Sequence, residues 1–527
     1  MSRDVTAEEA KTLIHDGAEI AFLDLREAGE FGEGHPLFAI PCAYSTLEAR
    51  IAVLVPRRGV RVLLIDGGDG VAARGAAALE ALGYGDVMTV AGGTPAWAAA
   101  GYTLFQGVNV PSKTLGELAE HAWHPKTIDA QTLKRWQDEG RRFRFFDARP
   151  PAEYAKMRVP GAVCLPNGEL AHRFPAVVGG EDTPVVVTCA GRTRGILGVL
   201  GLRLAGIDQP VYALENGTQG WQLAGFALER GNTAARYPAL DSAAAAATRA
   251  RADTVMAHHG IASVTAEDVA AWRADPARTT YLFDLRAPEE TAADPAPAFL
   301  PALSGQLVQA TDQWVGVRHA RLVLLDDLGL RAAIAAFWLR QLGYEVAVAR
   351  IDDALRRLPA PAAAPALPAV DNVAAGEALQ AVREGKARFV DLRSSHAYRS
   401  GHVAGALWSI RPRLGRLPLG PATAVYLIGD DAAVTALAAG ELRSLGVTAV
   451  RAVRGGQAAL AAAGAAVEAS PHTPGPEEAI DFLFFVHDRH DGNLESSRRY
   501  LAWEQGLIAQ LDAAERAAFV LGDPPPG

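Results

Sequence analysis

Short apolar runs recur along this chain at regular intervals, and each is closed by a charged tripeptide of the form Asp-X-Arg. The four tripeptides begin at Asp24, Asp147, Asp284 and Asp391. A second apolar run follows each and ends at Asp66, Cys189, Asp326 and Gly429, which is 42 residues further on in three units and 38 in the fourth. Such runs predict buried strands. Their shared spacing therefore predicts one folding unit that is used four times.

Each second run leads into an Ala- and Leu-rich segment with helical spacing, which a glycine ends. The four glycines are Gly83, Gly206, Gly343 and Gly446. Another short strand comes next, and a glycine-rich turn follows it in three of the four units. Strands that alternate with helices predict an α/β fold in which mainly parallel sheets are covered on both faces. Ligands of such sheets bind beyond the carboxyl ends of the strands, which is where Cys189 falls.

The repeats and their connections divide the chain into five segments. We expect four domains and a mostly helical C-terminal tail, with boundaries at 1–107, 125–232, 258–356, 371–470 and 471–527. The alanine-rich residues 234–257 favour a helical connector. Alternating proline and alanine over 359–368 predict a stiff, extended spacer.

The tail carries signals that the repeats do not share. Residues 480–486 are strand-like or buried, and residues 494–521 have helical periodicity with dense charge. Trp503, Leu507 and Leu511 share one face of such a helix, which predicts packing on a domain or on a second subunit. The segment His487 to Asp491 contains two histidines but no recognised set of metal ligands, so we expect a polar docking segment there.

Composition narrows the class of protein. The 527 residues carry a net charge of −9, so wholesale binding to nucleic acid is not expected. Three cysteines in so long a chain make no disulfide framework, which favours a reducing cytoplasm. The N-terminus lacks the apolar core of a signal peptide, and no apolar run is long enough to span a membrane. We therefore expect a soluble cytoplasmic protein.

The concentrated chemistry of the chain lies at Cys189. A β-branched run, Val185–Thr188, leads to this cysteine, and an apolar helical segment begins shortly after it. A strand, loop and helix in this order aim backbone amides and a helix N-terminus at the sulfur. Two arginines of the loop add positive charge, which favours both a thiolate and an anionic substrate. The loop residues expected to bind substrate are Ala190, Gly191, Arg192, Thr193, Arg194 and Gly195.

These elements resemble the rhodanese sulfurtransferases. The second unit contains Asp147-Ala148-Arg149, Pro160-Gly161-Ala162 and the Cys189 loop, and the fourth contains Gly401-His402-Val403-Ala404-Gly405-Ala406. The resemblance implies four tandem rhodanese-like domains with five-stranded sheets. It implies that Cys189 carries a persulfide between thiosulfate and an acceptor such as cyanide or a cellular thiol. It implies no metal or organic cofactor, and it identifies Arg194 as the loop arginine of the family.

Other residues of the repeats are expected to have structural roles. Asp147 and Arg149 have counterparts in all four units, so we expect an ion pair that supports the loop. Asp66 and Asp326 stand where the second unit has its cysteine, and Gly429 does so in the fourth, which predicts three inactive domains. The loops after the two aspartates are expected to lack arginines. Cys42 and Cys164 are expected to pack in the core, with Cys164 a resolving thiol if it lies close to Cys189.

Three alternatives to this function can be weighed from the sequence, and the loop length argues against the second. A 3-mercaptopyruvate sulfurtransferase would use the same cysteine, although its relatives tend to carry a less cationic loop. A phosphatase or arsenate reductase needs five residues between cysteine and arginine, whereas Arg194 comes one place early. A persulfide relay or scaffold would use a protein as sulfur acceptor. For the sulfurtransferase we expect a small-molecule sulfur donor and a thiol acceptor as partners, or a protein as acceptor, with neither nucleic acid nor membrane.

Overall fold

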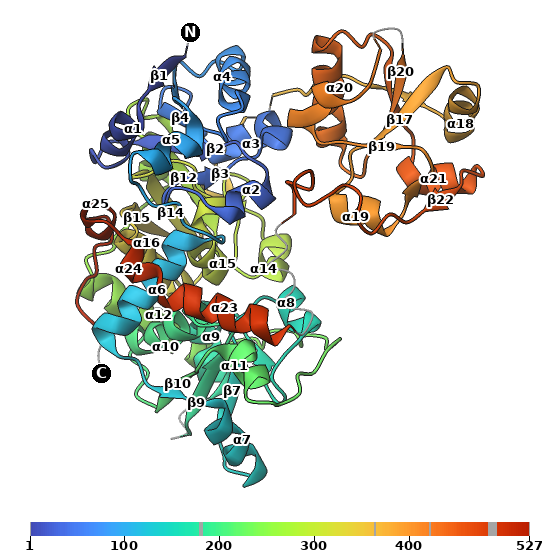
Figure 1. The fold of residues 1–527 in the computed structure, drawn as a ribbon. Coiled ribbons are helices and arrows are strands. Elements are labelled where there is room, and N and C mark those ends of the chain that lie inside the picture. Colours follow the sequence, from blue (N-terminus) through green and yellow to red (C-terminus); the bar gives the residue numbers. More distant parts are fainter. Residues whose placement is uncertain (1, 179–182, 363–364, 421–422, 483–492, 526–527) are drawn as a thin grey trace. The chain divides into compact units, whose positions relative to one another are not determined.

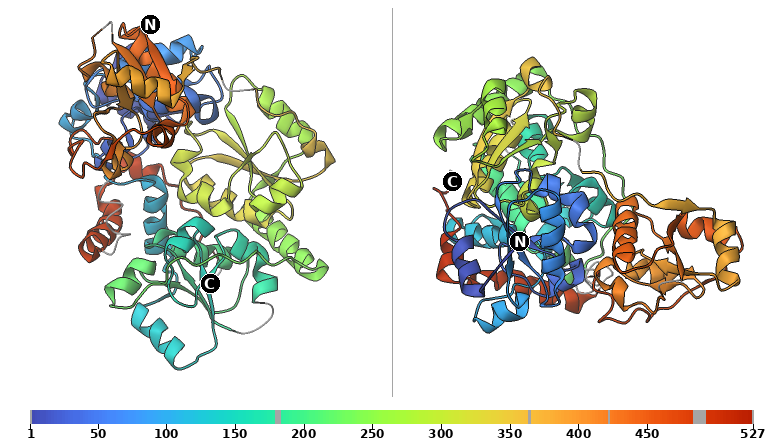
Figure 2. Two further views of the ribbon diagram at one scale, coloured as in Figure 1. Left: turned by 90° about the vertical axis from the view of Figure 1, so that its right-hand side faces the viewer. Right: turned by 90° about the horizontal axis from the view of Figure 1, so that it is seen from above.

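The computed structural model describes the whole chain except residues 1, 179–182, 363–364, 421–422, 483–492 and 526–527. Within the described residues, four five-stranded parallel sheets form, one from each repeat. Figures 1 and 2 show each sheet with helices along both faces. The first and fourth sheets belong to one compact unit of the chain and the second and third to another. The predicted fold of repeated, helix-flanked parallel sheets is confirmed.

The first repeat forms the sheet β1-β5-β4-β2-β3. Its strands are β1 (Arg3–Val5), β2 (Ile20–Asp24), β3 (Ile40–Pro41), β4 (Arg61–Ile65) and β5 (Asp86–Val90). Its helices are α1 (Ala7–Ile14), α2 (Ala28–Glu33), η1 (Tyr44–Thr46), α3 (Leu47–Leu54), α4 (Val71–Ala81) and α5 (Gly93–Ala99). The helix α6 (Val110–Trp123) follows and leads to the second repeat.

The second repeat has the same strand order, β6-β10-β9-β7-β8. Its strands are β6 (Thr127–Ile128), β7 (Arg144–Asp147), β8 (Val163–Cys164), β9 (Val185–Thr188) and β10 (Val211–Leu214). Its helices are α7 (Ala130–Asp138), α8 (Pro151–Lys156), α9 (Glu169–Val177), α10 (Thr193–Leu204) and α11 (Gly217–Leu223). The predicted connector forms α12 (Ser242–His258), which the side chain of Asp241 caps by accepting from the Ala244 amide.

The third repeat forms β11-β15-β14-β12-β13. Its strands are β11 (Ala262–Ser263), β12 (Thr280–Asp284), β13 (Leu300–Pro301), β14 (Arg321–Asp326) and β15 (Glu345–Arg350). Its helices are α13 (Ala266–Ala274), α14 (Pro288–Ala293), α15 (Ser304–Gln309), η2 (Thr311–Gln313), α16 (Leu330–Gln341) and α17 (Asp353–Arg356).

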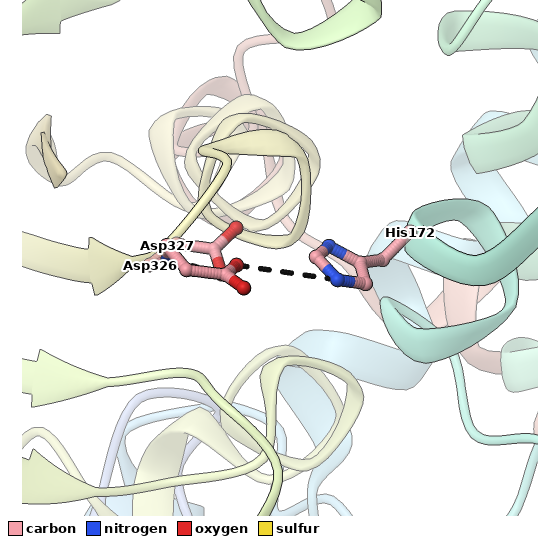
Figure 3. A group of neighbouring side chains, drawn as sticks. All are labelled: His172, Asp326 and Asp327. Carbon is pink, nitrogen blue, oxygen red and sulfur yellow. Dashed lines mark hydrogen bonds and ion pairs between the residues drawn. The ribbon is translucent and has the colours of Figure 1, made fainter. Parts of the chain in front are cut away.

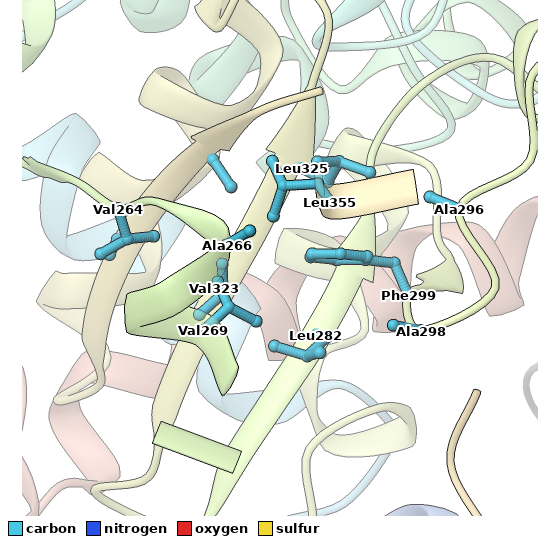
Figure 4. Close-up of a cluster of buried hydrophobic side chains, with 12 residues drawn as sticks. Val264, Ala266, Val269, Leu282, Ala296, Ala298, Phe299, Val323, Leu325 and Leu355 are labelled. Atoms are coloured by element: carbon cyan, nitrogen blue, oxygen red, sulfur yellow. The ribbon is translucent and has the colours of Figure 1, made fainter. Parts of the chain in front are cut away.

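A dense apolar core on one face of the third sheet shows what holds each repeat together. Val323 and Leu325 alternate along β14 and meet Leu282 of the neighbouring β12, with Phe299 and Leu355 beside them (Figure 4). Val323 and Leu325 are completely buried. Burial of each such side chain contributes about 1.5–3 kcal/mol to the free energy of folding. A shift of register would expose these side chains, so this face fixes the pairing of the strands and therefore where their carboxyl ends lie.

The fourth repeat forms β16-β21-β20-β17-β19, with β18 and β22 paired antiparallel beside it. Its strands are β16 (Asp371–Val373), β17 (Ala387–Asp391), β18 (His402–Val403), β19 (Leu407–Trp408), β20 (Ala424–Ile428), β21 (Val450–Val453) and β22 (Val467–Glu468). Its helices are α18 (Ala375–Arg383), α19 (Ser395–Ser400), η3 (Arg411–Arg416), α20 (Ala432–Ser444) and α21 (Gly456–Ala462).

The tail differs from the single helical stretch that the sequence predicts over 494–521. It forms α23 (Leu494–Gln505), α24 (Leu507–Gln510) and α25 (Ala513–Ala517). Gly506 ends the first of these helices, and Asp512 starts the last as its N-cap. Trp503, Leu507 and Leu511 therefore do not share one helix, although Leu507 is completely buried.

The first part of the tail is only partly described. Ile480 is buried in a turn rather than in a strand, and the charged segment His487 to Asp491 lies outside the described residues. None of the described helices combines the length and the apolar content that a membrane crossing needs.

Candidate functional site

Cys189 lies at the carboxyl end of the central strand β9, immediately before the amino end of α10. The backbone amides of Gly195 and Gly191 hydrogen-bond to its sulfur. A Cβ atom built on Gly195 would lie 3.8 Å from Sγ, so the loop backbone wraps closely around the sulfur. The side chain is only 2% exposed. The loop thus forms an anion-binding nest of amides with the sulfur inside it.

The glycine-rich turn after β10 holds this loop in place. The Thr218 amide donates to the carbonyl oxygen of Cys189 at 2.8 Å. The Gln219 amide, the Gln219 side chain and the Thr218 hydroxyl all donate to the carbonyl oxygen of Ala190 at 3.2 Å. The amino end of α11 therefore fixes the carbonyl groups of Cys189 and Ala190, which leaves the loop amides free to turn toward the sulfur.

Replacing Gly217 with alanine is expected to damage the loop. Gly217 has φ +52°, and a Cβ atom there would overlap the carbonyl oxygen of Cys189. We expect a loss of about 3 kcal/mol in unfolding free energy, from steric overlap and backbone strain together, measured by urea denaturation. The matched control is Gly225→Ala, at φ +86° with open space around it, which should lose only about 1 kcal/mol. Equal losses in the two variants would contradict the packing argument.

The two loop arginines are engaged with carboxylates and do not form the open cationic site that the sequence predicts. Arg192 donates from Nε to Glu117 Oε1 at 2.7 Å and also pairs with Glu120 of the same helix, α6. Arg194 donates to both carboxylate oxygens of Glu153 at 2.7 Å. Sequence reasoning missed these carboxylates because they lie 41 to 75 residues away along the chain.

The electrostatics of the sulfur reflect two opposing influences. Burial raises the pKa of the Cys189 thiol above its ordinary value. Arg194 and the amides of Gly195 and Gly191 act in the opposite direction and favour the thiolate, while the Glu504 carboxylate favours the thiol. Burial likewise raises the pKa of Glu117 to about 7, against the influence of Arg192.

Reactivity of Cys189 is therefore expected to rise with pH. The thiolate is the nucleophile, and its fraction grows as the pH approaches the raised pKa. The rate of alkylation by iodoacetamide should increase through pH 9 without reaching a plateau, as followed by mass spectrometry of the peptide. A plateau below pH 8 would contradict this expectation.

Asp147 and Arg149 form a buried ion pair beneath the loop. Arg149 donates to Asp147 at 2.6 Å and to the carbonyl oxygen of Met157, which ends α8, at 2.5 Å. The equivalent arginines pair with Asp24, Asp284 and Asp391 and likewise reach the backbone at the end of the next helix. In all four repeats the arginine therefore links the end of the strand to the end of the following helix.

The other two cysteines belong to other segments: Cys42 follows β3 in the first repeat, and Cys164 lies on β8 in the second. Both are buried, and burial raises the pKa of each thiol to about 12. Cys164 lies on β8, and β7 separates this strand from β9. Two strand spacings amount to about 10 Å, which is too far for a disulfide with Cys189 without backbone movement. The structure therefore does not place a resolving thiol beside Cys189.

The corresponding loops of the first and fourth repeats bind carboxylates of the protein itself, at the cysteine position in the first repeat and at the helix cap in the fourth. Asp66 accepts from the amides of Gly68 and Ala72 at 2.9 Å, and Ala72 lies six residues after Asp66, as Gly195 does after Cys189. In the fourth repeat the exposed Asp431 caps α20 by accepting from the amides of Ala433 and Val434, and a Cβ atom on Gly429 would overlap the Thr435 hydroxyl. A carboxylate therefore takes the position of the sulfur in the first repeat, and the Thr435 hydroxyl lies next to that position in the fourth.

The third repeat contains an arginine that corrects the sequence-based expectation. Arg331 lies five residues after Asp326, the spacing at which Arg194 follows Cys189, so this loop does carry an arginine. Arg331 is completely buried and pairs with Asp326 at 2.8 Å. It also pairs with Asp327, Glu169 and Glu290, at 2.8, 2.7 and 2.7 Å. This network fills the third nest.

One cluster beside this network has the residue types of a metal site. His172, Asp326 and Asp327 place one potential ligand atom each within 4.8 Å of one another (Figure 3). However, Arg331 donates to Asp326 Oδ1 and to Asp327 Oδ1, and the latter oxygen lies 4.0 Å from His172 Nε2. Burial and the Arg331 charge lower the pKa of His172 to about 4. The guanidinium therefore already supplies the cation that these carboxylates need.

A further residue at the Cys189 loop was not found from the sequence. Glu504 of α23 is 1% exposed, and its Oε1 accepts from the Thr193 hydroxyl at 2.7 Å. Its Oε2 would lie 3.1 Å from a Cβ atom on Gly191. Glu504 is 311 residues from Thr193 in the sequence. Since the tail shares no pattern with the repeats, no sequence signal links it to this loop.

Comparison with known proteins identifies the family. The model of the family described as "Rhodanese-like domain" matches residues 6–100 and 129–224. The crystal structure of a thiosulfate sulfurtransferase from Pseudomonas aeruginosa is 35% identical, with TM-score 0.90, over 99% of this chain and 100% of that chain. This chain therefore belongs to the rhodanese family and is one of its multi-domain members.

Other solved structures match smaller parts of the chain. The Alr3790 protein from Anabaena sp. is 26% identical over 19% of this chain and 92% of that one, with TM-score 0.18. SseA from Escherichia coli, a 3-mercaptopyruvate sulfotransferase, is 18% identical over 41% of this chain and 99% of that one, with TM-score 0.18. A search of curated proteins found no match.

Proposed function

We propose that this protein is a sulfurtransferase that moves the sulfane sulfur of thiosulfate to a thiophilic acceptor through a persulfide on Cys189. The observation that carries the proposal is the nest of loop amides around the sulfur, with Gly191 and Gly195 hydrogen-bonded to it. The match to the thiosulfate sulfurtransferase of Pseudomonas aeruginosa over the whole chain supports the choice of donor.

The chemistry requires two displacements at one sulfur atom. The Cys189 thiolate attacks the outer sulfur of thiosulfate, a bond to Sγ forms, and sulfite leaves with the electron pair of the broken S–S bond. The acceptor, cyanide in an assay or a thiol in a cell, then attacks the terminal sulfur, and Cys189 leaves as the thiolate. Loop residues 190–195 are proposed to bind the donor and to stabilise each anionic sulfur in turn.

The remaining repeats are proposed to have no transfer activity of their own. The proposed domains are residues 1–107, 258–356 and 371–470, and the catalytic domain is 125–232. Asp66 and Asp326 occupy the cysteine position in the first and third repeats, and Gly429 stands there in the fourth. Neither these carboxylates nor Gly429 has the nucleophilicity of a thiolate.

The decisive experiment is mass spectrometry of the protein after incubation with thiosulfate. One added sulfur atom is expected on the peptide that contains Cys189, with none on the peptides of Cys42 and Cys164. The control is Cys189→Ala, which should gain no sulfur. Incubation with 3-mercaptopyruvate in place of thiosulfate separates the two donors. Absence of added sulfur with either compound would contradict the proposal.

A second candidate is a persulfide relay that takes its sulfur from a partner protein. The 2% exposure of Cys189 favours this alternative, because a free small molecule must first reach a covered sulfur. Weak turnover with free thiosulfate and cyanide, together with rapid transfer from a persulfidated protein, would support the relay. Rapid turnover with the free compounds would exclude the need for one.

A further inference from the structure

The C-terminal tail packs directly on the Cys189 loop. Helix α23 contacts α11 and α6, the two helices whose residues hold the loop (Figure 1). Tyr500 and Leu501 of α23 are buried. Lys113 of α6 lies 5.2 Å from the ring centre of Tyr500 and 4.7 Å from that of Trp503. This cation–π arrangement and the buried side chains fix the helix against α6.

Glu504 is the residue of α23 that reaches the loop. Its carboxylate is fully enclosed, with Oε1 bonded to the Thr193 hydroxyl. Among the described residues, its Oε2 atom has no hydrogen-bond partner. A Cβ atom on Gly191, whose amide hydrogen-bonds to the sulfur, would lie 3.1 Å from this Oε2. Burying an oxygen of a carboxylate without a partner is costly, so the placement calls for an explanation.

The charges around the loop are not those of a site open to anions. The loop contributes the guanidinium groups of Arg192 and Arg194, and both are already paired with carboxylates. Arg192 faces Glu117 and Glu120 of α6, and Arg194 faces Glu153. Glu504 adds a further carboxylate on the side of Gly191, with no cation bonded to it among the described residues. An anion approaching from that side meets a like charge, so its approach to the sulfur is disfavoured relative to that of a neutral molecule.

We propose that Glu504 is a specificity-determining residue of the Cys189 site, because its carboxylate, held beside Gly191 by α23, repels anionic reagents on their way to the sulfur. As far as it concerns sulfur donors, this inference rests on the proposed function. A dianion such as thiosulfate then reaches Cys189 efficiently only when α23 moves away or when the charge of Glu504 is neutralised. A neutral reagent of similar size is not discriminated in this way.

The test compares two alkylating reagents that differ in charge. Iodoacetate is an anion and iodoacetamide is neutral, and both react with the thiolate, so the ratio of their rates is independent of the thiol pKa. The variant Glu504→Gln keeps the shape of the side chain and its acceptor for Thr193. The control is Glu495→Gln, at an exposed position on the same helix. Thermal unfolding of each variant checks that the fold is retained.

The expected result is a rise of about tenfold in the iodoacetate-to-iodoacetamide ratio at Cys189 in Glu504→Gln, with no change in Glu495→Gln. The inference would also be supported if iodoacetate labelled Cys189 in Glu504→Gln but in neither the wild type nor Glu495→Gln. A ratio that stays within twofold of the wild type, or both reagents accelerated equally, would overturn the inference. Labelling by neither reagent in either protein would overturn it as well.

The same variants separate this inference from the proposed function. If the proposed function holds, kcat/KM for thiosulfate should rise about tenfold in Glu504→Gln and remain unchanged in Glu495→Gln. A rise in the alkylation ratio without turnover in any variant would support the role of Glu504 and would contradict thiosulfate as donor. Turnover with an unchanged ratio would support the function and overturn the inference.

Discussion

Replacing Cys189 with serine is expected to reduce transfer of sulfur from thiosulfate to cyanide by about 10³-fold or more, to the background rate. A serine hydroxyl is a far weaker nucleophile at neutral pH and forms no persulfide. The amides of Gly191 and Gly195 would still be present, so binding of the donor alone should produce no turnover. Release of thiocyanate under saturating thiosulfate is the measurement.

The matched control for this variant is Cys164→Ser. Cys164 is a buried thiol of the same repeat, its sulfur lies 3.5 Å from the carbonyl oxygen of Arg149, and a serine hydroxyl can donate to that oxygen as well. Activity should remain within about twofold of the wild type, because β7 separates this position from Cys189. Turnover that survived in Cys189→Ser, or that was lost in Cys164→Ser, would place the reacting sulfur elsewhere.

Replacing Arg331 with methionine is expected to lower the free energy of unfolding by about 3–5 kcal/mol. Arg331 is completely buried between carboxylates of two repeats, and methionine leaves them without this cation. Glu169 and Glu290 retain their bonds to Arg173, which limits the loss. Urea denaturation measures the loss, and hydrogen exchange of residues 321–342 locates it in the third repeat.

The control for this second variant is Arg340→Met, which removes an exposed guanidinium from the same helix and should lose less than about 1 kcal/mol. The pH dependence provides a further check. Although burial opposes the effect, Arg331 and Arg173 lower the pKa of Glu290 to about 2. The stability that this pairing contributes is present above pH 4.5 and is lost as the pH falls toward 2. Equal losses in the two arginine variants would contradict the role of the buried network.

The repeat architecture and the position of the cysteine loop followed from sequence alone. Apolar runs that end at Asp66, Cys189 and Asp326 became strands β4, β9 and β14, each followed by a helix. These features depend on local patterning and on a spacing that three repeats share, so one sequence contains the information several times over. The placement of Cys189 at the carboxyl end of a parallel strand follows from the same pattern, since the order of strand, loop and helix fixes it.

The partners of these residues were decided only by the tertiary structure. Arg192 and Arg194 looked like free cations because Glu117 and Glu153 lie in other segments of the chain. Glu504 reaches Thr193 across 311 residues, from a tail that repeats nothing. Sequence therefore determined which backbone surrounds the sulfur, because that depends on neighbours along the chain. Packing of distant helices decided which charges face it, because ion pairs and burial depend on contacts that carry no periodic signal.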